Sequence, residues 1–301
     1  MQRQLTGDLV LVFVTLCWGI TFPLIENAVQ QVNPAVFVAV RFILGALLLL
    51  PFVWRFFKMP HLGEVVKAGV VLGLMNAVVY LAQTIGMETI SAAEGAFITG
   101  ATVIIVPFLL PVFKLGKIIR TDVIFALICL FGLFLLTGAS FSHVSRGELW
   151  VLLCAFFNAA AIVYLQKVSM RLKNLSVLAF MQIGFTGVFA SFFTIGKPYA
   201  DILAPQALIG LLFCAIFASS LALLLQTKYQ HYTTANRAAM IFCLEPLFGG
   251  LFGYLINGET LGWISFCGGA LIVVSIVSAE LYRVYGQKNN NAVDASSAIE
   301  A

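Results

Sequence analysis

Ten long runs of apolar residues, joined by short polar stretches, account for most of this chain. A helix needs roughly 20 apolar residues to cross a bilayer core about 30 Å thick. Each run has about that length, and the first is too long for the core of a signal peptide. The pattern therefore predicts an all-α integral membrane protein with ten transmembrane helices. The predicted spans are 8–29, 34–54, 65–87, 91–113, 121–139, 148–168, 175–195, 207–228, 234–256 and 260–282.

Composition supports lipid as the solvent around these helices. Hydrophobic residues make up 61% of the 301 residues and charged residues 10%, whereas soluble domains average about 25% charged residues. The six cysteines stand singly within apolar runs, so neither a disulfide framework nor a zinc site is expected. The sequence holds no metal motif, no P-loop and no nucleophile elbow. We expect a protein that is not an enzyme, needs no cofactor and does not bind nucleic acid.

The distribution of Lys and Arg predicts how the helices are oriented, because cytoplasmic loops of membrane proteins are enriched in basic residues. With a cytoplasmic N-terminus, 14 of the 17 Lys and Arg residues fall on the cytoplasmic side and two fall outside. The remaining one, Arg41, lies within a predicted span. We therefore expect a multi-pass protein with both termini in the cytoplasm.

Two halves of the chain resemble each other. When residues 81–100 are laid over the stretch that begins at residue 224, Gln83 falls on Gln226 and Ser91 falls on Thr234. Since each copy holds five helices, an odd number, the second copy must cross the membrane upside down. We predict two inverted five-helix repeats, 1–140 and 141–285. Such repeats are typical of secondary transporters, although channels contain repeats as well.

The polar residues from 286 to 301 follow the last apolar run. Segments with so few apolar residues do not bury enough surface to fold alone. We expect a disordered cytoplasmic tail there.

Glu245 is predicted near the middle of the ninth span, directly before Pro246. Proline removes a backbone donor and interrupts a helix. A carboxyl group at this depth is costly and therefore needs a reason. It could contact a substrate or carry a proton, since a low dielectric favours its neutral form. A structural carboxyl group at a helix kink, paired with a polar neighbour, explains the residue equally well.

Arg41 and Glu94 are the other two ionisable residues of interest. Arg41 could hold an anionic substrate group, extend toward the outer interface, or pair with Glu26 or Glu94. Glu94 lies at the start of the fourth span, where the helix dipole favours a carboxylate. That position is enough to explain Glu94, although a role in proton coupling or at an outer gate stays open.

Several uncharged side chains are predicted at similar depth, and polar groups there must face the bundle interior or a wet cavity. We expect about half of them to line a cavity and the rest to hold helices together. These residues are Trp18, Thr21, Asn76, Tyr80, Asn158 and Tyr164.

Three prolines predict bends in the spans. Pro23 and Pro107 are expected to bend the first and fourth spans, and Pro246 to break the ninth. Pro107 falls later than Pro246 in the repeat register. The fourth and ninth spans are therefore expected to kink at different depths.

Four segments resemble the EamA-type members of the drug/metabolite transporter superfamily. They are Cys17–Pro23 (CWGITFP), Arg41-Phe42, Leu244-Glu245-Pro246, and Gly258–Leu261 followed by Gly268–Ile272. The resemblance covers both halves of the chain. It implies ten helices in two inverted repeats, a central substrate cavity and a bacterial inner membrane location. It also implies export of amino acids or other small metabolites.

These observations favour a secondary carrier that works by alternating access. The candidate substrate-binding residues are Trp18, Thr21, Arg41, Asn76, Tyr80, Asn158, Tyr164 and Glu245. Protons are a candidate coupling ion, through Glu245 or Glu94, and transport without protons stays open. The alternative is a passive channel or pore for small solutes, although the chain offers no ring of like charges as a filter. A membrane-embedded enzyme is a third reading, for which the chain lacks a convincing acid/base or nucleophile set.

Overall fold

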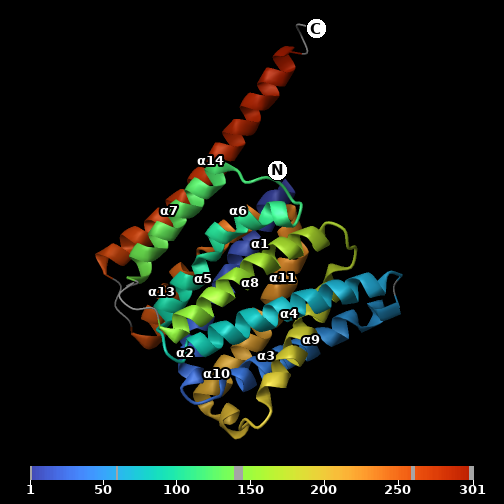
Figure 1. The fold of residues 1–301 in the computed structure, drawn as a ribbon, viewed down its shortest axis with the longest axis vertical. Coiled ribbons are helices and arrows are strands. Elements are labelled where there is room, and N and C mark those ends of the chain that lie inside the picture. Colours follow the sequence, from blue (N-terminus) through green and yellow to red (C-terminus); the bar gives the residue numbers. More distant parts are fainter. Residues whose placement is uncertain (1, 59, 139–144, 259–261, 298–301) are drawn as a thin grey trace.

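A computed structural model describes residues 2–58, 60–138, 145–258 and 262–297 (Figure 1). Every regular element among these residues is a helix. Ten helical segments are long and apolar enough to cross a membrane, which confirms the predicted spans with small shifts at their ends. These segments are Gln2–Val29, Pro34–Val53, Leu62–Gly86, Ala92–Val112, Arg120–Thr137, Arg146–Ser169, Leu175–Thr194, Pro205–Tyr232, Ala235–Ile256 and Trp263–Tyr282.

Some spans are built on one long helix and others are broken. The long helices are α3 (Pro34–Val53), α4 (Leu62–Gly86), α7 (Arg120–Thr137), α8 (Arg146–Ser169), α9 (Leu175–Ser191) and α14 (Trp263–Ser297). The broken spans are α1 (Gln2–Gly19) with α2 (Thr21–Val29), α5 (Ala92–Gly100) with α6 (Thr102–Val112), and α12 (Ala235–Phe242) with α13 (Glu245–Asn257). The eighth span joins α10 (Pro205–Phe213), the π-helix η4 (Cys214–Leu221), α11 (Ala222–Tyr229) and the short η5 (Gln230–Tyr232).

The fourth and ninth spans break at matching positions. The break between α5 and α6 falls at Ala101, which corresponds to Leu244 between α12 and α13 in the repeat register. The expectation that these spans kink at different depths is therefore wrong. Pro107 lies inside α6 and does not mark the break. Pro246 occupies the first turn of α13, where a helix tolerates proline because no backbone donor is needed.

The starts of corresponding helices are also alike. Ser91 accepts a hydrogen bond from a backbone amide at the start of α5, and Thr234 does the same for α12. Gly7 of α1 packs against residues 229 and 232, while Gly147 of α8 packs against residues 86 and 89. These matched contacts support two related halves. Their opposite orientation in a membrane stays a prediction.

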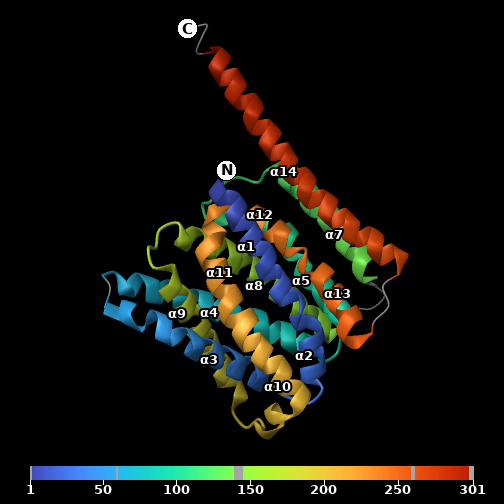
Figure 2. The ribbon, with the colours of Figure 1, turned by 180° about the vertical axis from the view of Figure 1, so that it is seen from behind.

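Both chain ends lie toward one end of the bundle, named the terminal end (Figures 1 and 2). The connections after α3, α6, α8 and α11 belong to that end, since successive spans reverse direction. The connections after α2, α4, α7, α9 and α13 belong to the opposite end. Helices α7 and α14 lie side by side along one edge, and α4 packs between α8 and α9.

The last part of α14 projects away from the bundle at the terminal end (Figure 2). Helix α14 continues to Ser297, so residues 286–297 are helical where composition predicts a disordered tail. The spanning part of α14 already supplies a formed helix, and extending a formed helix is easier than nucleating a new one. Residues 259–261, within one of the segments that resemble the family, lie outside the described residues.

Candidate functional site

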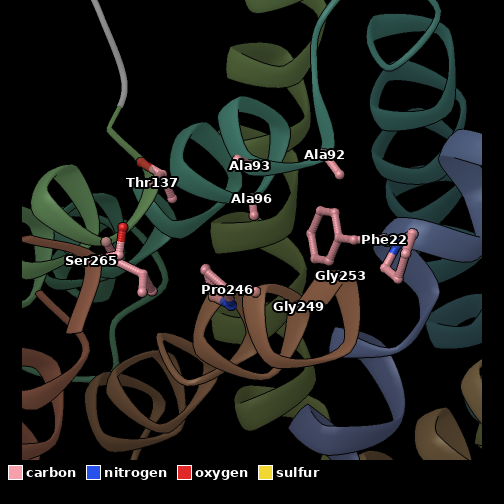
Figure 3. A pocket seen from close by; sticks show the side chains of 12 residues that line it. Phe22, Ala92, Ala93, Ala96, Thr137, Pro246, Gly249, Gly253 and Ser265 are labelled. Atoms are coloured by element: carbon pink, nitrogen blue, oxygen red, sulfur yellow. The ribbon is translucent and has the colours of Figure 1, made fainter. Parts of the chain in front are cut away.

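A cavity of about 130 Å³ lies between α5 and α13 at the opposite end. Figure 3 shows Ala92 and Ala96 of α5 facing Pro246 and Gly249 of α13, with the ring of Phe22 at one side. Among its lining residues none is charged. Small and apolar side chains therefore form an entrance that repels no solute by charge.

Two smaller cavities lie deeper and share residues with this entrance. The first has a volume of about 10 Å³ and shares Ala96 and Pro246 with the entrance. The second has a volume of about 20 Å³ and shares Asn158 with the first. The three cavities thus form a series that leads from the opposite end into the middle of the bundle. We call the two deeper ones the inner cavities.

Glu245 lines the first inner cavity together with Asn158, Thr99 and Thr102. It is the first residue of α13, so its position follows from the break in the ninth span. Glu245 is the single ionisable carboxylate or basic group among the described residues that line the three cavities. The cavity series therefore carries at most one negative charge and no positive charge.

The second inner cavity is lined by aromatic rings and side-chain amides. Its polar and aromatic residues are Trp18, Asn76, Tyr80, Asn158, Gln182 and Gln226. The Trp18 ring also packs against Phe242, with ring centroids 5.2 Å apart. Asn76 and Tyr80, four residues apart on α4, share one helix face. This explains why both reach the same cavity.

Arg41 stays inside the bundle and does not extend toward an interface. Only 1% of the residue is exposed, and its Nε donates to Ser219 Oγ at 2.7 Å. Its guanidinium carbon lies 4.9 Å from the ring centroid of Tyr80 and 5.2 Å from that of Phe42. Arg41 makes no ion pair with a carboxylate of the described residues, so the expected pairing is wrong.

The π-helix η4 supplies the partners of two predicted site residues. A π-helix carries i→i+5 hydrogen bonds and is wider than an α-helix, which leaves some backbone groups free for other partners. Trp18 Nε1 donates to the carbonyl oxygen of Ala218 at 3.1 Å. Ser219 accepts from Arg41, and Ser220 Oγ donates to the Gly45 carbonyl oxygen at 2.8 Å. η4 thereby fixes the positions of Trp18 and Arg41.

Several predicted site residues do not line the cavities. Thr21 donates to the carbonyl oxygen of Trp18 at 2.6 Å, within the break between α1 and α2. Tyr164 packs its ring against Phe113, with centroids 6.3 Å apart. Glu94 forms a capping box with Ser91 at the start of α5. Of the eight candidates, the structure brings Trp18, Asn76, Tyr80, Asn158 and Glu245 to the cavity walls.

A network of charged residues joins helices at the terminal end. Arg237, at the start of α12, forms ion pairs with Asp8 of α1 and Glu280 of α14. The neighbouring Asn236 donates to Asp122 of α7. These contacts join α12 to three other helices. The side chains of Asp8 and Arg237 are only 12% and 14% exposed, so water screens their attraction less than it would at a surface.

Sequence comparison now decides the family. The model of the EamA-like transporter family matches residues 5–138 and, in a second copy, residues 145–279. The chain belongs to the EamA-like transporter family. The two matches correspond to the two related halves.

Curated relatives and solved structures agree with this assignment. An uncharacterized transporter of Archaeoglobus fulgidus is 30% identical over 93% of this chain and 87% of its own length. The uncharacterized transporter YvbV of Bacillus subtilis is 28% identical over 89% of both chains. A solved crystal structure shares the fold with a TM-score of 0.74 at 15% identity, covering 92% of this chain and 97% of its own. The protein is therefore a membrane transporter of this family.

Proposed function

We propose that this EamA-like transporter is a secondary carrier that moves a small metabolite out of the cell by alternating access. The observation that carries the proposal is the series of three cavities, which reaches the middle of the bundle from the opposite end, while a charged network joins the helices at the terminal end. With both termini in the cytoplasm of a bacterium, this arrangement corresponds to a state open to the outside.

In this mechanism the substrate occupies the inner cavities, between residues of α1, α4, α8 and α13. Separation of Arg237 from Asp8 and Glu280 would release α12 from α1 and α14 and open the terminal end. Closure of α5 onto α13 would shut the entrance at the same time. Two related halves favour such an exchange, because each half can adopt the conformation of the other.

A proton could couple this cycle through Glu245. The titratable groups within electrostatic range of its carboxylate are Arg41, Tyr80, Cys154 and Cys243, and of these Arg41 alone carries a charge in its usual state. Replacing Glu245 by Gln keeps the size of the side chain and removes the titration. We expect Glu245→Gln to abolish the pH dependence of transport. Transport that still depends on pH in this variant would assign the proton to another group.

The carrier itself can be tested in inside-out membrane vesicles with a panel of labelled amino acids, amines, nucleosides and organic anions, with and without a proton gradient. A carrier saturates with substrate concentration and shows counterflow, in which an unlabelled solute on one side drives uptake of the labelled one. Uptake that never saturates and shows no counterflow would establish a passive pore instead. Absence of transport for every class would count against a carrier of small metabolites.

A further inference from the structure

The side-chain amides in the walls of the inner cavities are oriented by hydrogen bonds that end on backbone carbonyl groups. Thr227 Oγ1 donates to the carbonyl oxygen of Leu223, which leaves its oxygen to accept a bond. Gln182 therefore donates to it through Nε2, at 2.6 Å, and turns its own Oε1 toward Asn76. Asn76 donates to that oxygen at 3.5 Å. One N–H of Asn76 is thus bonded to Gln182, and Asn76 Oδ1 is left without a donor among the described residues.

Two further amides are oriented by the same logic. Thr102 Oγ1 donates to the Ala155 carbonyl oxygen at 3.2 Å and accepts from Asn158 Nδ2 at 3.4 Å. Gln230 Nε2 donates to the Ile162 carbonyl oxygen at 2.8 Å, so its Oε1 accepts from Gln226 Nε2 at 3.0 Å. In each case a backbone oxygen decides which end of the amide donates.

The three amides therefore leave their oxygens available. No donor of the described residues is bonded to Asn76 Oδ1, Asn158 Oδ1 or Gln226 Oε1, and all three residues line the inner cavities. The carboxylate of Glu245 adds two more acceptor oxygens, also without a hydrogen bond from a described residue. Each amide nitrogen of Asn76, Asn158, Gln182 and Gln226 uses one N–H in these bonds and keeps a second. The walls therefore offer amide N–H donors as well, but their one ionisable carboxylate, Glu245, is an acceptor. The Tyr80 hydroxyl can accept as well as donate.

The two strongest donors nearby, Trp18 and Arg41, are both held by η4. Trp18 Nε1 donates to the Ala218 carbonyl oxygen. The guanidinium of Arg41 lies against the Tyr80 and Phe42 rings and donates to Ser219 through Nε, while its Nη1 is buried without a hydrogen-bond partner among the described residues; Arg41 does not line the cavities. A carboxylate or phosphate placed beside Glu245 would meet a second carboxylate and amide oxygens. An ammonium group has three donors and no acceptor, which matches these walls.

From this arrangement we infer that the inner cavities widen to bind a small protonated amine with an aromatic or apolar body, the ammonium group lying between Glu245 and the oxygens of Asn158 and Asn76. The rings of Trp18 and Tyr80 supply the surface for that body, and the face of Trp18 can also attract the cation, whereas the Tyr80 ring already carries the guanidinium of Arg41. The inference rests on the proposed function, because it names the substrate class of the same site.

Direct binding to the purified full-length protein tests the inference, with tyramine as the probe. Tyrosol and 4-hydroxyphenylacetate share its ring and carry a neutral and an anionic group in place of the amine. We expect saturable binding of labelled tyramine and at least tenfold weaker binding of the other two, because only the ammonium pairs with Glu245. Glu245→Gln should weaken tyramine binding at least tenfold. Glu88→Gln, the same change at an exposed carboxylate outside the cavities, should leave it unchanged.

A rescue variant separates loss of recognition from loss of folding. In Glu245→Gln combined with Asn158→Asp, the carboxylate is moved across the first inner cavity, and tyramine binding should recover at least threefold over Glu245→Gln alone. Equal affinity in the wild type and Glu245→Gln, tighter binding of 4-hydroxyphenylacetate, or no binding of tyramine would each overturn the inference. If the vesicle panel then shows transport of a solute that is not an amine, the carrier is supported and only the amine site is wrong. If the panel shows no transport of any class, both the carrier and the amine site are contradicted.

Discussion

The start of α5 and the start of α12 are built alike but carry opposite charges at the same position. Each begins after a hydroxyl residue that caps the helix, Ser91 or Thr234. The third helical residue is Glu94 in α5 and Arg237 in α12. Glu94 turns back and caps its own helix, whereas Arg237 reaches Asp8 and Glu280 on two other helices.

The neighbouring helices extend this difference between the two ends. Asp8 of α1 corresponds to Glu148 of α8, which forms a capping box with Ser145. At the opposite end both carboxylates are therefore satisfied within their own helices, and a cavity of about 130 Å³ remains between α5 and α13. At the terminal end unlike charges join the helices. The two ends thus differ in the charge at one matched position, with ion pairs between helices at the terminal end and a cavity at the opposite end.

The largest effect is expected from removing that charge at the terminal end. Arg237→Leu leaves Asp8 and Glu280 facing each other without a cation. Losing one partner of a buried pair costs about 3 kcal/mol, so the thermal midpoint should fall and transport should be lost. A cysteine placed at Thr233, which is buried, should react faster with a thiol reagent in this variant.

Arg237→Lys is the matched control, because Lys keeps the charge but cannot bind two carboxylates with a rigid fork. We expect it to fall between the wild type and Arg237→Leu in both measurements. Unchanged thiol reactivity in Arg237→Leu would mean that packing alone holds the terminal end shut.

A smaller effect is expected from giving the opposite end the charge of the terminal end. Glu94→Arg would place a guanidinium where it can pair with Glu148, as Arg237 pairs with Asp8. An ion pair worth about 1 kcal/mol shifts a two-state equilibrium about fivefold. We expect a similar loss of transport, with slower labelling of a cysteine introduced at Ala93 in the entrance.

Glu94→Gln separates charge from capping, since Gln also serves in a capping box. Transport and its pH dependence should stay at the wild-type level in this variant. A loss of pH dependence would restore Glu94 as a coupling residue. Equal transport in Glu94→Arg and the wild type would show that the two ends do not respond to charge in the same way.

The smallest effect is expected from the caps that the two ends share. Ser91→Ala and Thr234→Ala each remove a side-chain acceptor at a helix start, which costs about 1 kcal/mol. Chemical denaturation should give losses of similar size, and neither variant should change substrate selectivity. A difference of more than about 1 kcal/mol between them would mean that the two caps are not equivalent.

The spans and the break at Glu245 could be predicted because their causes are local. Lipid requires long apolar helices, and Pro246 interrupts one of them at a position visible in the sequence. Helix geometry could also have separated two of the candidate site residues. Asn158 and Tyr164 are six residues apart on α8, which puts them on different faces. Both could not line one cavity, and the structure places Asn158 there and Tyr164 against Phe113.

The partners of Arg41 and the roles of the amides could not be predicted in this way. Arg41 meets Ser219, which is 178 residues away in the chain. No local pattern marks the π-helix that carries Ser219, and its small residues resemble those of any close helix contact. Gln226 was visible as a repeated residue, but its orientation depends on Gln230 and on a backbone oxygen of α8. Such contacts appear only when the helices are assembled.

The π-helix η4 has a consequence for insertions and deletions in this chain. A regular α-helix turns by about 100° per residue. The wide turn of η4 takes up one residue more than an α-helical turn, so deleting one residue between Cys214 and Leu221 would let the eighth span become regular without rotating α11 relative to α10. Gln226 would keep its bond to Gln230, whereas the contacts made within the wide turn, of Ala218 with Trp18 and of Ser219 with Arg41, would be lost. The same deletion anywhere else in this span would rotate its second half by about 100°.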